Sequence, residues 1–577
     1  MEQLLTVKNM RVSFLREGEW HEAVHGIDFS VPKGKTLGIV GESGSGKSVS
    51  SLALMRLLDK RRSRVEADSI TLAGHDILNV DDDAMCDIRG RRIAMIFQEP
   101  MTSLNPLYKC GFQVAEALMA HGRLTDEVAH DRVIDLFQKV MLPRPEKIYD
   151  SYPHQLSGGQ KQRVMIAMAL ACSPELLIAD EPTTALDVTV QKEILRLLRR
   201  LQQDSGEMSM IFISHDLAVV AEISDYIAVM HDGVIVEYGD AKSVLENPQD
   251  TYTKGLMACR PPLNCRLRRL PTVKEFVDGV WDSNKDFKTD LVITEEERAC
   301  RLKELYSREP LLSVRGLKTW FPLRKGIFNR VADNVKAVDD VSFDVFPGET
   351  LGLVGESGCG KTTLGRSLLR LEHNAAGAVF FEGKDVMSLK GRELRDFHRA
   401  AQIVFQDPYS SLNPKMRVGD AIAEPLLAHG LVSDVEERRA RVCRILEEVG
   451  MKASDYHKYP HEFSGGQRQR ICIARTLVLK PKLVICDESV SALDVSVQAQ
   501  VLNLLNSLKE ALGFTIIFIS HDLSVVRFMS DRILVMYGGK MVELGDADEV
   551  FVNPKNDYTR KLINAIPKIN EDNKRDI

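Results

Sequence analysis

The sequence GESGSGKS at residues 41–48 returns as GESGCGKT at residues 355–362, and a short hydrophobic run, LGIV or LGLV, precedes each copy. The landmarks FQ, SGGQ, DE and SHD then follow both copies in the same order. The two copies are 314 residues apart, and SGGQ, DE and SHD recur after 307, 307 and 306 residues. Because solenoid units span only about 20–50 residues, a repeat of this size is a whole domain. The chain is therefore predicted to hold two copies of one domain.

The repeat divides the 577-residue chain into four parts. We expect a first domain at residues 1–260, a linker at 261–310, a second domain at 311–570 and a C-terminal tail at 571–577. Each domain opens with an alternating strand pattern, LLTVKNMRVSF or LLSVRGLKTWF. The linker mixes basic and acidic residues and has a predicted short helix at 295–306. Fully extended, it could reach roughly 160 Å at about 3.3 Å per residue, so the two domains can pair within one chain.

Composition narrows the class of protein. With 44% hydrophobic and 27% charged residues, the chain is an ordinary soluble globular sequence. Its net charge of -6 and pI near 6.2 give no basic footprint, so no nucleic-acid partner is expected. We find neither a membrane-spanning apolar run nor a signal-peptide pattern, and expect a chain that is neither exported nor membrane-spanning. The ten scattered cysteines are typical of reduced thiols, so no disulfides are expected.

Short, continuous hydrophobic runs predict the central sheet of each domain. LGIV (37–40), LLIA (176–179) and MIFIS (210–214) are each followed by a turn or a polar signal. This pattern is typical of parallel strands that are covered on both faces. Residues 128–141 and 435–449, between the glycine-rich stretch and SGGQ, are predicted helices of an inserted subdomain.

Each glycine-rich stretch fits GxxxxGK[ST], the pattern of a phosphate-binding loop (P-loop). Glycines let backbone N–H groups curl into an anion-binding nest, the following helix N-terminus favours polyphosphate, and the lysine reaches the β- and γ-phosphate oxygens. The hydroxyls of Ser48 and Thr362 would hold Mg²⁺. One match could be a chance glycine-rich turn, but two matches after hydrophobic strands exclude that interpretation. The predicted phosphate-contacting residues are Gly41, Ser43, Gly44, Gly46, Lys47, Ser48, Gly355, Ser357, Gly358, Gly360, Lys361, Thr362 and Thr363.

Paired carboxylates end a predicted strand in each domain, in LLIADE (176–181) and LVICDE (483–488). Asp180 and Asp487 would orient Mg²⁺ through water. Glu181 and Glu488 would polarise an attacking water. A bare Asp-Glu pair is more often a solvated loop, but the strand context and the spacing favour catalysis.

Two further side chains recur beside these motifs. His215 and His521 each close a strand within SHD, from which an imidazole can reach the γ-phosphate side of the pocket. A lone histidine there is usually structural, but its duplication favours a functional role. Gln98 and Gln406 lie at the junction with the helical insert, where a side-chain amide could contact metal and water.

At LSGGQ (156–160) and FSGGQ (463–467) the chain resembles a tandem ATP-binding cassette (ABC) ATPase. Three further pairs of segments make the resemblance closer: FQEPMTSLNP and FQDPYSSLNP, YPHQLSGGQKQR and YPHEFSGGQRQR, and NPQDTYTKGL and NPKNDYTRKL. They resemble the ATPase subunits of dipeptide, oligopeptide and nickel importers, in a fused form similar to the glutathione and microcin C importer ATPases. The resemblance covers everything except the linker and the extreme C-terminus.

The resemblance implies an α/β fold of two P-loop NTPase cassettes, each with a RecA-like, mostly parallel sheet, an antiparallel β subdomain and an inserted helical subdomain. It also implies head-to-tail pairing, in which the SGGQ of one domain covers ATP held by the other. Residues that it adds to the nucleotide sites are Phe14 and Phe321, as adenine-stacking rings, with Ser157, Gly158, Gly159, Gln160, Ser464, Gly465, Gly466 and Gln467. It assigns hydrolysis to Glu181, His215, Glu488 and His521, and Mg²⁺ contact to Ser48, Gln98, Thr362 and Gln406.

The implied function is the energy-coupling subunit of an importer at the cytoplasmic face of a bacterial inner membrane. Its partners would be two integral membrane permease subunits and, through them, a solute-binding protein. Peptide-like solutes are the leading cargo, while nickel, opines and short oligosaccharides stay open. An alternative is a soluble tandem ATPase that acts on ribosomes, but the mixed charge of the linker and the importer-type tails argue against it. A DNA-repair ATPase is a second alternative, but zinc-type cysteine pairs are missing.

The chain departs from the family pattern in two places. Ser489 stands in DESVSALD where the family usually has proline, but Asp487, Glu488 and Asp494 are intact, so both sites are expected to be competent. Cys259 and Cys265 lie where some relatives carry iron–sulfur ligands. Because four clustered ligands are absent, we interpret these two cysteines as free thiols.

Overall fold

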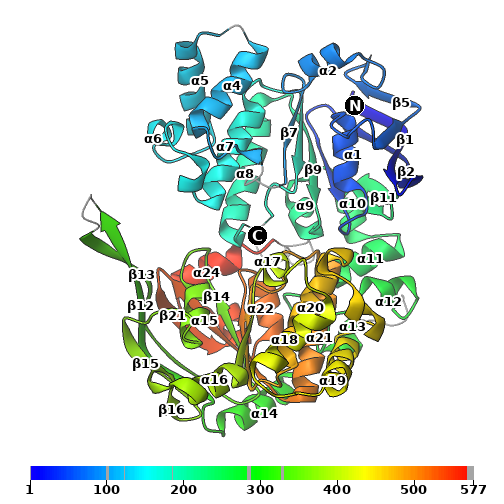
Figure 1. The fold of residues 1–577 in the computed structure, drawn as a ribbon. Coiled ribbons are helices and arrows are strands. Elements are labelled where there is room, and N and C mark those ends of the chain that lie inside the picture. Colours follow the sequence, from blue (N-terminus) through cyan, green and yellow to red (C-terminus); the bar gives the residue numbers. More distant parts are fainter. Residues whose placement is uncertain are drawn as a thin grey trace.

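The computed structural model describes residues 2–98, 103–122, 124–184, 186–281, 287–325 and 330–567. In Figure 1 the two domains lie one above the other, with the last helix, α24 (Asp557–Asn564), between them. Each domain has an antiparallel sheet, a larger and mostly parallel sheet, and helices inserted ahead of its SGGQ motif. The predicted α/β fold of two similar domains is therefore confirmed.

The larger sheets of the two domains have the same strand order, β11-β10-β3-β9-β8-β7 and β21-β20-β14-β19-β18-β17. Neighbouring strands are parallel, except for the antiparallel edge strands β11 and β21. The strands are β3 (Thr36–Val40), β7 (Ile93–Ile96), β8 (Leu176–Asp180), β9 (Ser209–Ser214), β10 (Tyr226–His231) and β11 (Val234–Asp240), then β14 (Thr350–Val354), β17 (Ala401–Val404), β18 (Leu483–Asp487), β19 (Thr515–Ile519), β20 (Arg532–Tyr537) and β21 (Lys540–Asp546). All residues of β3, β8 and β9 are buried, as their continuous hydrophobic runs predict.

The antiparallel sheets pack beside the P-loops. Their orders are β2-β1-β5-β6, with β4 on β1, and β13-β12-β15-β16. The strands are β1 (Gln3–Arg16), β2 (Glu19–Pro32), β4 (Ser63–Glu66), β5 (Ser69–Leu72), β6 (His75–Asp76), β12 (Leu312–Lys325), β13 (Arg330–Val345), β15 (Ala376–Phe381) and β16 (Lys384–Asp385).

Helices cover the sheets and form the inserted subdomains. Those on the sheets are α1 (Lys47–Leu54), α2 (Asp82–Ile88), α8 (Val188–Ser205), α9 (Leu217–Ile223), α10 (Ala241–Glu246), α11 (Thr251–Ala258), α15 (Lys361–Leu368), α16 (Gly391–Ala400), α21 (Val495–Leu512), α22 (Leu523–Met529), α23 (Ala547–Val552) and α24. The inserted helices are α4 (Cys110–His121), α5 (Asp126–Lys139), α6 (Pro145–Tyr149), α7 (Gly158–Leu170), α17 (Pro408–Ser411), α18 (Val418–Ala428), α19 (Val435–Glu448) and α20 (Gly465–Leu477). Both predicted insert helices, now α5 and α19, are confirmed with ends shifted by one or two residues.

The two domains face each other in opposite orientations. In Figure 1 the inserted helices of the first domain lie above the antiparallel sheet of the second, and the first domain's antiparallel sheet lies above the second domain's inserted helices. The contact between α24 and α8 joins the halves, because Lys192 Nζ donates a hydrogen bond to the carbonyl oxygen of Asn564.

The linker packs against both domains, since its first helix contacts α11 of the first domain while its backbone and arginines bond to the second. It contains α12 (Val273–Val277), α13 (Phe287–Leu291) and α14 (Glu295–Tyr306), so the predicted helix at 295–306 is confirmed. Leu270 is fully buried, and its backbone exchanges two hydrogen bonds of 2.7 and 2.8 Å with the side chain of Asn503 on α21. The extended tether that the sequence permits is therefore not the path that the chain takes.

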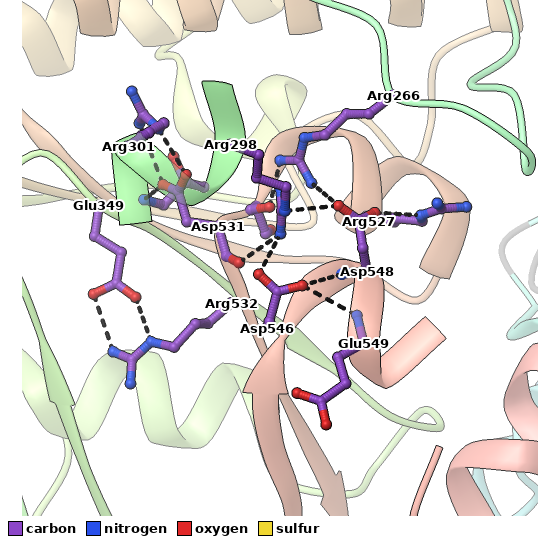
Figure 2. Close-up of polar contacts among 12 residues, drawn as sticks. Arg266, Arg298, Arg301, Glu349, Arg527, Asp531, Arg532, Asp546, Asp548 and Glu549 are labelled. Carbon is purple, nitrogen blue, oxygen red and sulfur yellow. Dashed lines mark hydrogen bonds and ion pairs between the residues drawn. The ribbon is translucent and has the colours of Figure 1, made fainter. Parts of the chain in front are cut away.

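A cluster of arginines fixes the linker in place (Figure 2). Arg298 on α14 forms ion pairs of 2.7 Å with both Asp546 and Asp548, and Arg301 pairs with Asp531 at 2.8 Å. Arg266 lies beside Asp548, and its burial lowers the pKa of the guanidinium to about 10. These guanidinium groups match three carboxylates of the second domain.

The first domain cannot receive the linker in the same way. Its segment GDAK at residues 239–242 corresponds to GDAD at residues 545–548, so Lys242 stands in the place of Asp548. An ammonium group there would repel the linker arginines. The arginine cluster of the linker is therefore specific for the second domain.

Among the residues that the structure describes, no helix combines the length and the apolar character needed to cross a membrane.

We expect Arg298→Met to destabilise the second domain by about 2 kcal/mol, because Asp546 loses its ion pair and Asp548 keeps only Arg527 and Arg266. Arg268→Met is the matched control, since Arg268 and its partner Glu297 are about half exposed and such a pair contributes at most about 1 kcal/mol. Urea unfolding followed by tryptophan fluorescence measures both changes. Equal effects of the two substitutions would contradict the anchoring role.

Candidate functional site

The P-loop of the first domain holds its lysine by backbone carbonyls. Lys47 is buried, and its Nζ donates to the carbonyl oxygens of Gly41 and Glu42, both at 2.7 Å. Burial lowers the pKa of Lys47, although Glu181, Asp494 and Asp180 favour its charged form. The ammonium therefore occupies the loop as a preformed cation.

The second P-loop repeats this geometry. Lys361 Nζ donates to the carbonyl oxygens of Gly355 (2.7 Å) and Glu356 (2.9 Å). Gly360 precedes α15 with φ of 106°, and a Cβ there would lie 2.0 Å from the carbonyl oxygen of Ala337. The position therefore requires glycine, for conformation and for space.

A hydroxyl and a carboxylate meet at the end of each central strand. Ser48 Oγ donates to Asp180 Oδ1, and Thr362 Oγ1 donates to Asp487 Oδ1, both at 2.9 Å. Burial raises the pKa of Asp180 to about 6 and also raises that of Asp487. Hydroxyl and carboxylate oxygens are the ligands that Mg²⁺ prefers, usually with phosphate oxygens and water. These pairs fit that ion, and no group of three His, Cys, Asp or Glu side chains in the described residues offers another metal site.

Glu181 is surrounded by hydrogen-bond donors. Its Oε2 accepts from Thr184 Oγ1 (2.7 Å) and Gln98 Nε2 (3.2 Å), and lies 3.2 Å from His215 Nδ1. Burial alone would raise the pKa of Glu181, but the contacts with His215 and Thr184 lower it to about 2. The contact with Glu181 also raises the pKa of His215 against the opposing effect of burial. A permanently ionised carboxylate of this kind is suited to orienting a water molecule.

Glu488 has a similar but smaller set of contacts. Its Oε2 accepts from Gln406 Nε2 at 2.9 Å and lies 3.4 Å from His521 Nδ1. Burial opposes the lowering of its pKa, which follows from His521 and from the Lys361 ammonium 4.0 Å away. Ser491, at the position of Thr184, donates to the Glu488 backbone carbonyl oxygen (2.9 Å) and not to its carboxylate. The two sites thus differ in how many donors hold the glutamate.

Both glutamates have a left-handed backbone with φ of 46°. This conformation is costly for a residue with a Cβ, and such strain concentrates at functional sites. Because both glutamates share this strain, we infer that the turn after each strand orients the glutamate side chain.

The SGGQ motifs begin helices α7 and α20. Ser157 and Ser464 are the N-caps, and each side-chain oxygen accepts from the backbone N–H of the following glutamine. Both serines are exposed, so their hydroxyls and the helix N-termini can meet an anion. Gly466 lies against α21, since a Cβ there would be 2.2 Å from Val497 Cγ1.

Contacts across the domain interface complete each site. The Ser43 N–H donates to Asp494 Oδ2 of the second domain, and the Ser357 N–H donates to Asp187 Oδ2 of the first, both at 3.4 Å. At the second P-loop, Thr189 Oγ1 also donates to Glu356 Oε1 at 3.0 Å. Each P-loop is therefore in contact with the opposite domain.

The structure leaves the aromatic predictions open. Phe14 packs against the core of the antiparallel sheet, and Phe321 is exposed on β12. Their adenine-stacking role stays a prediction.

Sequence reasoning missed several residues at these sites. It assigned no contact to Asp187 or Asp494, although the repeated ALD tripeptide at 185–187 and 492–494 was a signal. It also missed Thr184, which shares its position with a different residue type in the second domain. Ser489 is buried, as its place beside Glu488 requires.

Comparison with known proteins identifies two family patterns. A model of the ABC transporter family matches residues 24–184 and 338–491. A model described as the C-terminal region of oligopeptide/dipeptide transporters matches residues 236–284 and 542–577.

Curated relatives match almost the whole chain. The glutathione import ATP-binding protein of Pectobacterium atrosepticum is 47% identical over 577 residues, which are 98% of this chain and 90% of the relative. Its namesake from Escherichia coli O6:H1 is 47% identical over 98% of this chain and 89% of the relative. Among solved structures, a dimeric bacterial ABC transporter cassette is 27% identical and covers 41% of this chain and 98% of its own, with a TM-score of 0.37.

We expect Glu181→Gln and Glu488→Gln each to keep nucleotide binding while lowering turnover at the affected site by at least ~10²-fold, the usual scale for a positioned base. The amide keeps the size of the side chain but loses the charge that orients water. Glu246→Gln, at an exposed residue of α10, is the control. Steady-state phosphate release and equilibrium binding separate the two effects, and near-normal hydrolysis by the double variant would remove these residues from the mechanism.

Proposed function

Because this chain belongs to the ABC transporter family and carries two of its ATP-binding domains in one polypeptide, we propose that it is the energy-coupling ATPase of an importer for glutathione or short peptides. The observation that carries the choice of cargo is the 46–47% identity to glutathione import ATP-binding proteins over 98% of the chain. The C-terminal regions of oligopeptide/dipeptide transporter type support the same class of solute.

We propose that two ATP molecules bind between the domains, each on one P-loop. Lys47 or Lys361 would turn from its backbone carbonyls to the phosphates, and the N–H groups of the loop would bind the same anion. Mg²⁺, held by Ser48 and Asp180 or by Thr362 and Asp487, would neutralise charge on the phosphate oxygens. Glu181 or Glu488 would orient the attacking water, and His215 or His521 would hold that carboxylate in place.

The signature serines supply the remaining contacts in this proposal. Asp494 and Asp187 already reach the P-loop of the opposite domain. The SGGQ helices pack on the helices that follow these aspartates, with Gly159 against Val190 and Gly466 against Val497. Ser464 would therefore serve the ATP on Lys47, and Ser157 the ATP on Lys361. ATP that binds the closed pair more tightly than the open pair can drive a conformational change in a partner.

Permease subunits would dock on the exposed surface next to Gln98 and Gln406. In the first domain this surface carries the apolar side chains of Leu107, Tyr108 and Phe112, of which Leu107 is 80% exposed. The corresponding positions of the second domain are Lys415, Met416 and Asp420. This difference between the two domains fits two different membrane subunits at the cytoplasmic face of the membrane.

The composite sites predict which pairs of substitutions act on one pocket. Lys47→Ala with Ser464→Ala should leave more hydrolysis than Lys47→Ala with Ser157→Ala, because the first pair disables one site and the second pair damages both. Steady-state ATP hydrolysis of the two double variants and of the single variants, with permeases present, measures this. Cysteines placed at 43 and 464, which keep Lys47, should crosslink in the ATP-bound chain, and preferential crosslinking of 43 to 157 would overturn the pairing.

Coexpression with permeases tests the importer assignment. The chain should sediment with membrane vesicles when its permeases are present, and Leu107→Asp should weaken that association at least about threefold, the loss expected when one apolar contact is replaced by a charge. Leu371→Asp is the control, since Leu371 is also exposed but lies after α15. Equal binding to ribosomes, or to protein-free lipid vesicles, would contradict the proposal.

A further inference from the structure

The C-terminal helix of each domain places a tyrosine against its own P-loop. Tyr252 on α11 accepts a hydrogen bond at its Oη from the Glu42 N–H (3.1 Å). Tyr558 on α24 accepts the corresponding bond from the Glu356 N–H (3.0 Å). Both tyrosines belong to the segments that match the oligopeptide/dipeptide transporter C-terminal region, which the mechanism above does not use.

The P-loop residue that donates its N–H to each tyrosine also accepts a hydrogen bond from the P-loop lysine. Glu42 gives its N–H to Tyr252, and its carbonyl oxygen accepts from Lys47 Nζ at 2.7 Å. Glu356 stands in the same way between Tyr558 and Lys361, with a lysine contact of 2.9 Å. A change at the tyrosine hydroxyl therefore reaches the phosphate-binding ammonium through one residue.

The rings are fixed by packing, so the hydroxyls have little freedom. Tyr252 is 2% exposed and stacks on His231 with a centroid distance of 3.9 Å. Tyr558 packs on Tyr537 at 4.4 Å. Burial raises the pKa of both tyrosines well above the ordinary value, so each hydroxyl stays protonated. A protonated hydroxyl accepts the N–H of the loop through an oxygen lone pair.

The opposite domain holds the next amide of each loop. Ser43 follows Glu42 and gives its N–H to Asp494, and Ser357 follows Glu356 and gives its N–H to Asp187. Helix α24 also reaches the other domain, because its Asn564 carbonyl oxygen accepts from Lys192 on α8, the helix that follows Asp187. Two consecutive amides of each P-loop are thus held by two different domains.

We propose that Tyr252 and Tyr558 are positioning residues for ATP binding, and that each C-terminal helix couples its own P-loop to the contact with the opposite domain. The inference rests on the proposed function, since ATP is the ligand whose affinity it concerns. The hydrogen bond to the tyrosine hydroxyl fixes the P-loop backbone, so the lysine and the loop amides are already ordered when the phosphates bind.

Tyr252→Phe tests the hydroxyl alone, since the ring and its packing stay. In the full-length chain with Lys361→Ala, which leaves only the first P-loop competent, we expect the Kd for ATP to rise roughly 3- to 10-fold, the effect of one lost hydrogen bond. The Tyr252→Phe/Tyr558→Phe chain should show a similar rise in KM with kcat changed less than about twofold, because the carboxylates and the water keep their geometry.

Tyr238→Phe is the matched control. The Tyr238 hydroxyl likewise takes part in one hydrogen bond, here as the donor to the Ser30 carbonyl oxygen at 3.1 Å, but it lies between β11 and β2. We expect its Kd for ATP to equal that of the parent chain. A loss of thermal stability in Tyr252→Phe without a change in Kd, or an equal change in both variants, would show a merely structural role and overturn the inference.

A double-mutant cycle tests the coupling between domains. Tyr252 and Asp494 hold neighbouring amides of one loop, so the effects of Tyr252→Phe and Asp494→Asn on the Kd for ATP should depart from additivity by at least about threefold. Tyr252→Phe and Asp187→Asn act on different loops and should be additive. Additivity in both pairs would overturn the coupling, whereas a parent chain that does not hydrolyse ATP at all would overturn the proposed function itself.

Discussion

A buried ammonium on each P-loop is the constraint on which the rest of the site depends. Lys47 lies where water is largely excluded, and burial of a cation is costly unless oxygen atoms replace its hydration. Two backbone carbonyls do so here, within a tight loop that contains left-handed glycines, and the carboxylates of Asp180 and Glu181 favour the charged form of the lysine. A polyphosphate can replace these carbonyls with anionic oxygens, so the loop is already arranged around the ligand's charge.

The pairing of the domains follows from the same constraint. Within one domain a tyrosine holds the first of two neighbouring loop amides, and the opposite domain brings Asp494 or Asp187 to the second. Because the strand order is the same in both domains, one head-to-tail arrangement serves both loops. The sites are nevertheless not identical, since Thr184 holds Glu181 while Ser491 turns to the backbone.

Local chemistry was predictable from the sequence, and long-range chemistry was not. The hydrophobic runs before Gly41 and after Pro174 predicted buried strands, because continuous burial leaves a continuous apolar pattern. The hydroxyl–carboxylate pairs could be foreseen, since parallel strands end at one sheet edge. The contact between Ser43 and Asp494 spans 451 residues, and no spacing rule reaches so far. The contact of Tyr252 with the P-loop and the docking of the linker were missed for the same reason. A repeated residue indicates that its position recurs, but it does not indicate which residue it contacts.

The docked linker changes how the two ATPase domains associate. Two separate ATPase chains associate at a rate and to an extent that depend on their concentration, whereas a short connection converts the encounter into an intramolecular event at an effective concentration of about millimolar. Arg298 and Arg301 form ion pairs with the second domain, so this part of the linker follows a fixed path. The first domain is therefore held beside the second domain of its own chain. One polypeptide therefore carries the two unlike ATPase domains in a one-to-one ratio, and the high effective concentration favours their pairing over pairs of two first domains or two second domains.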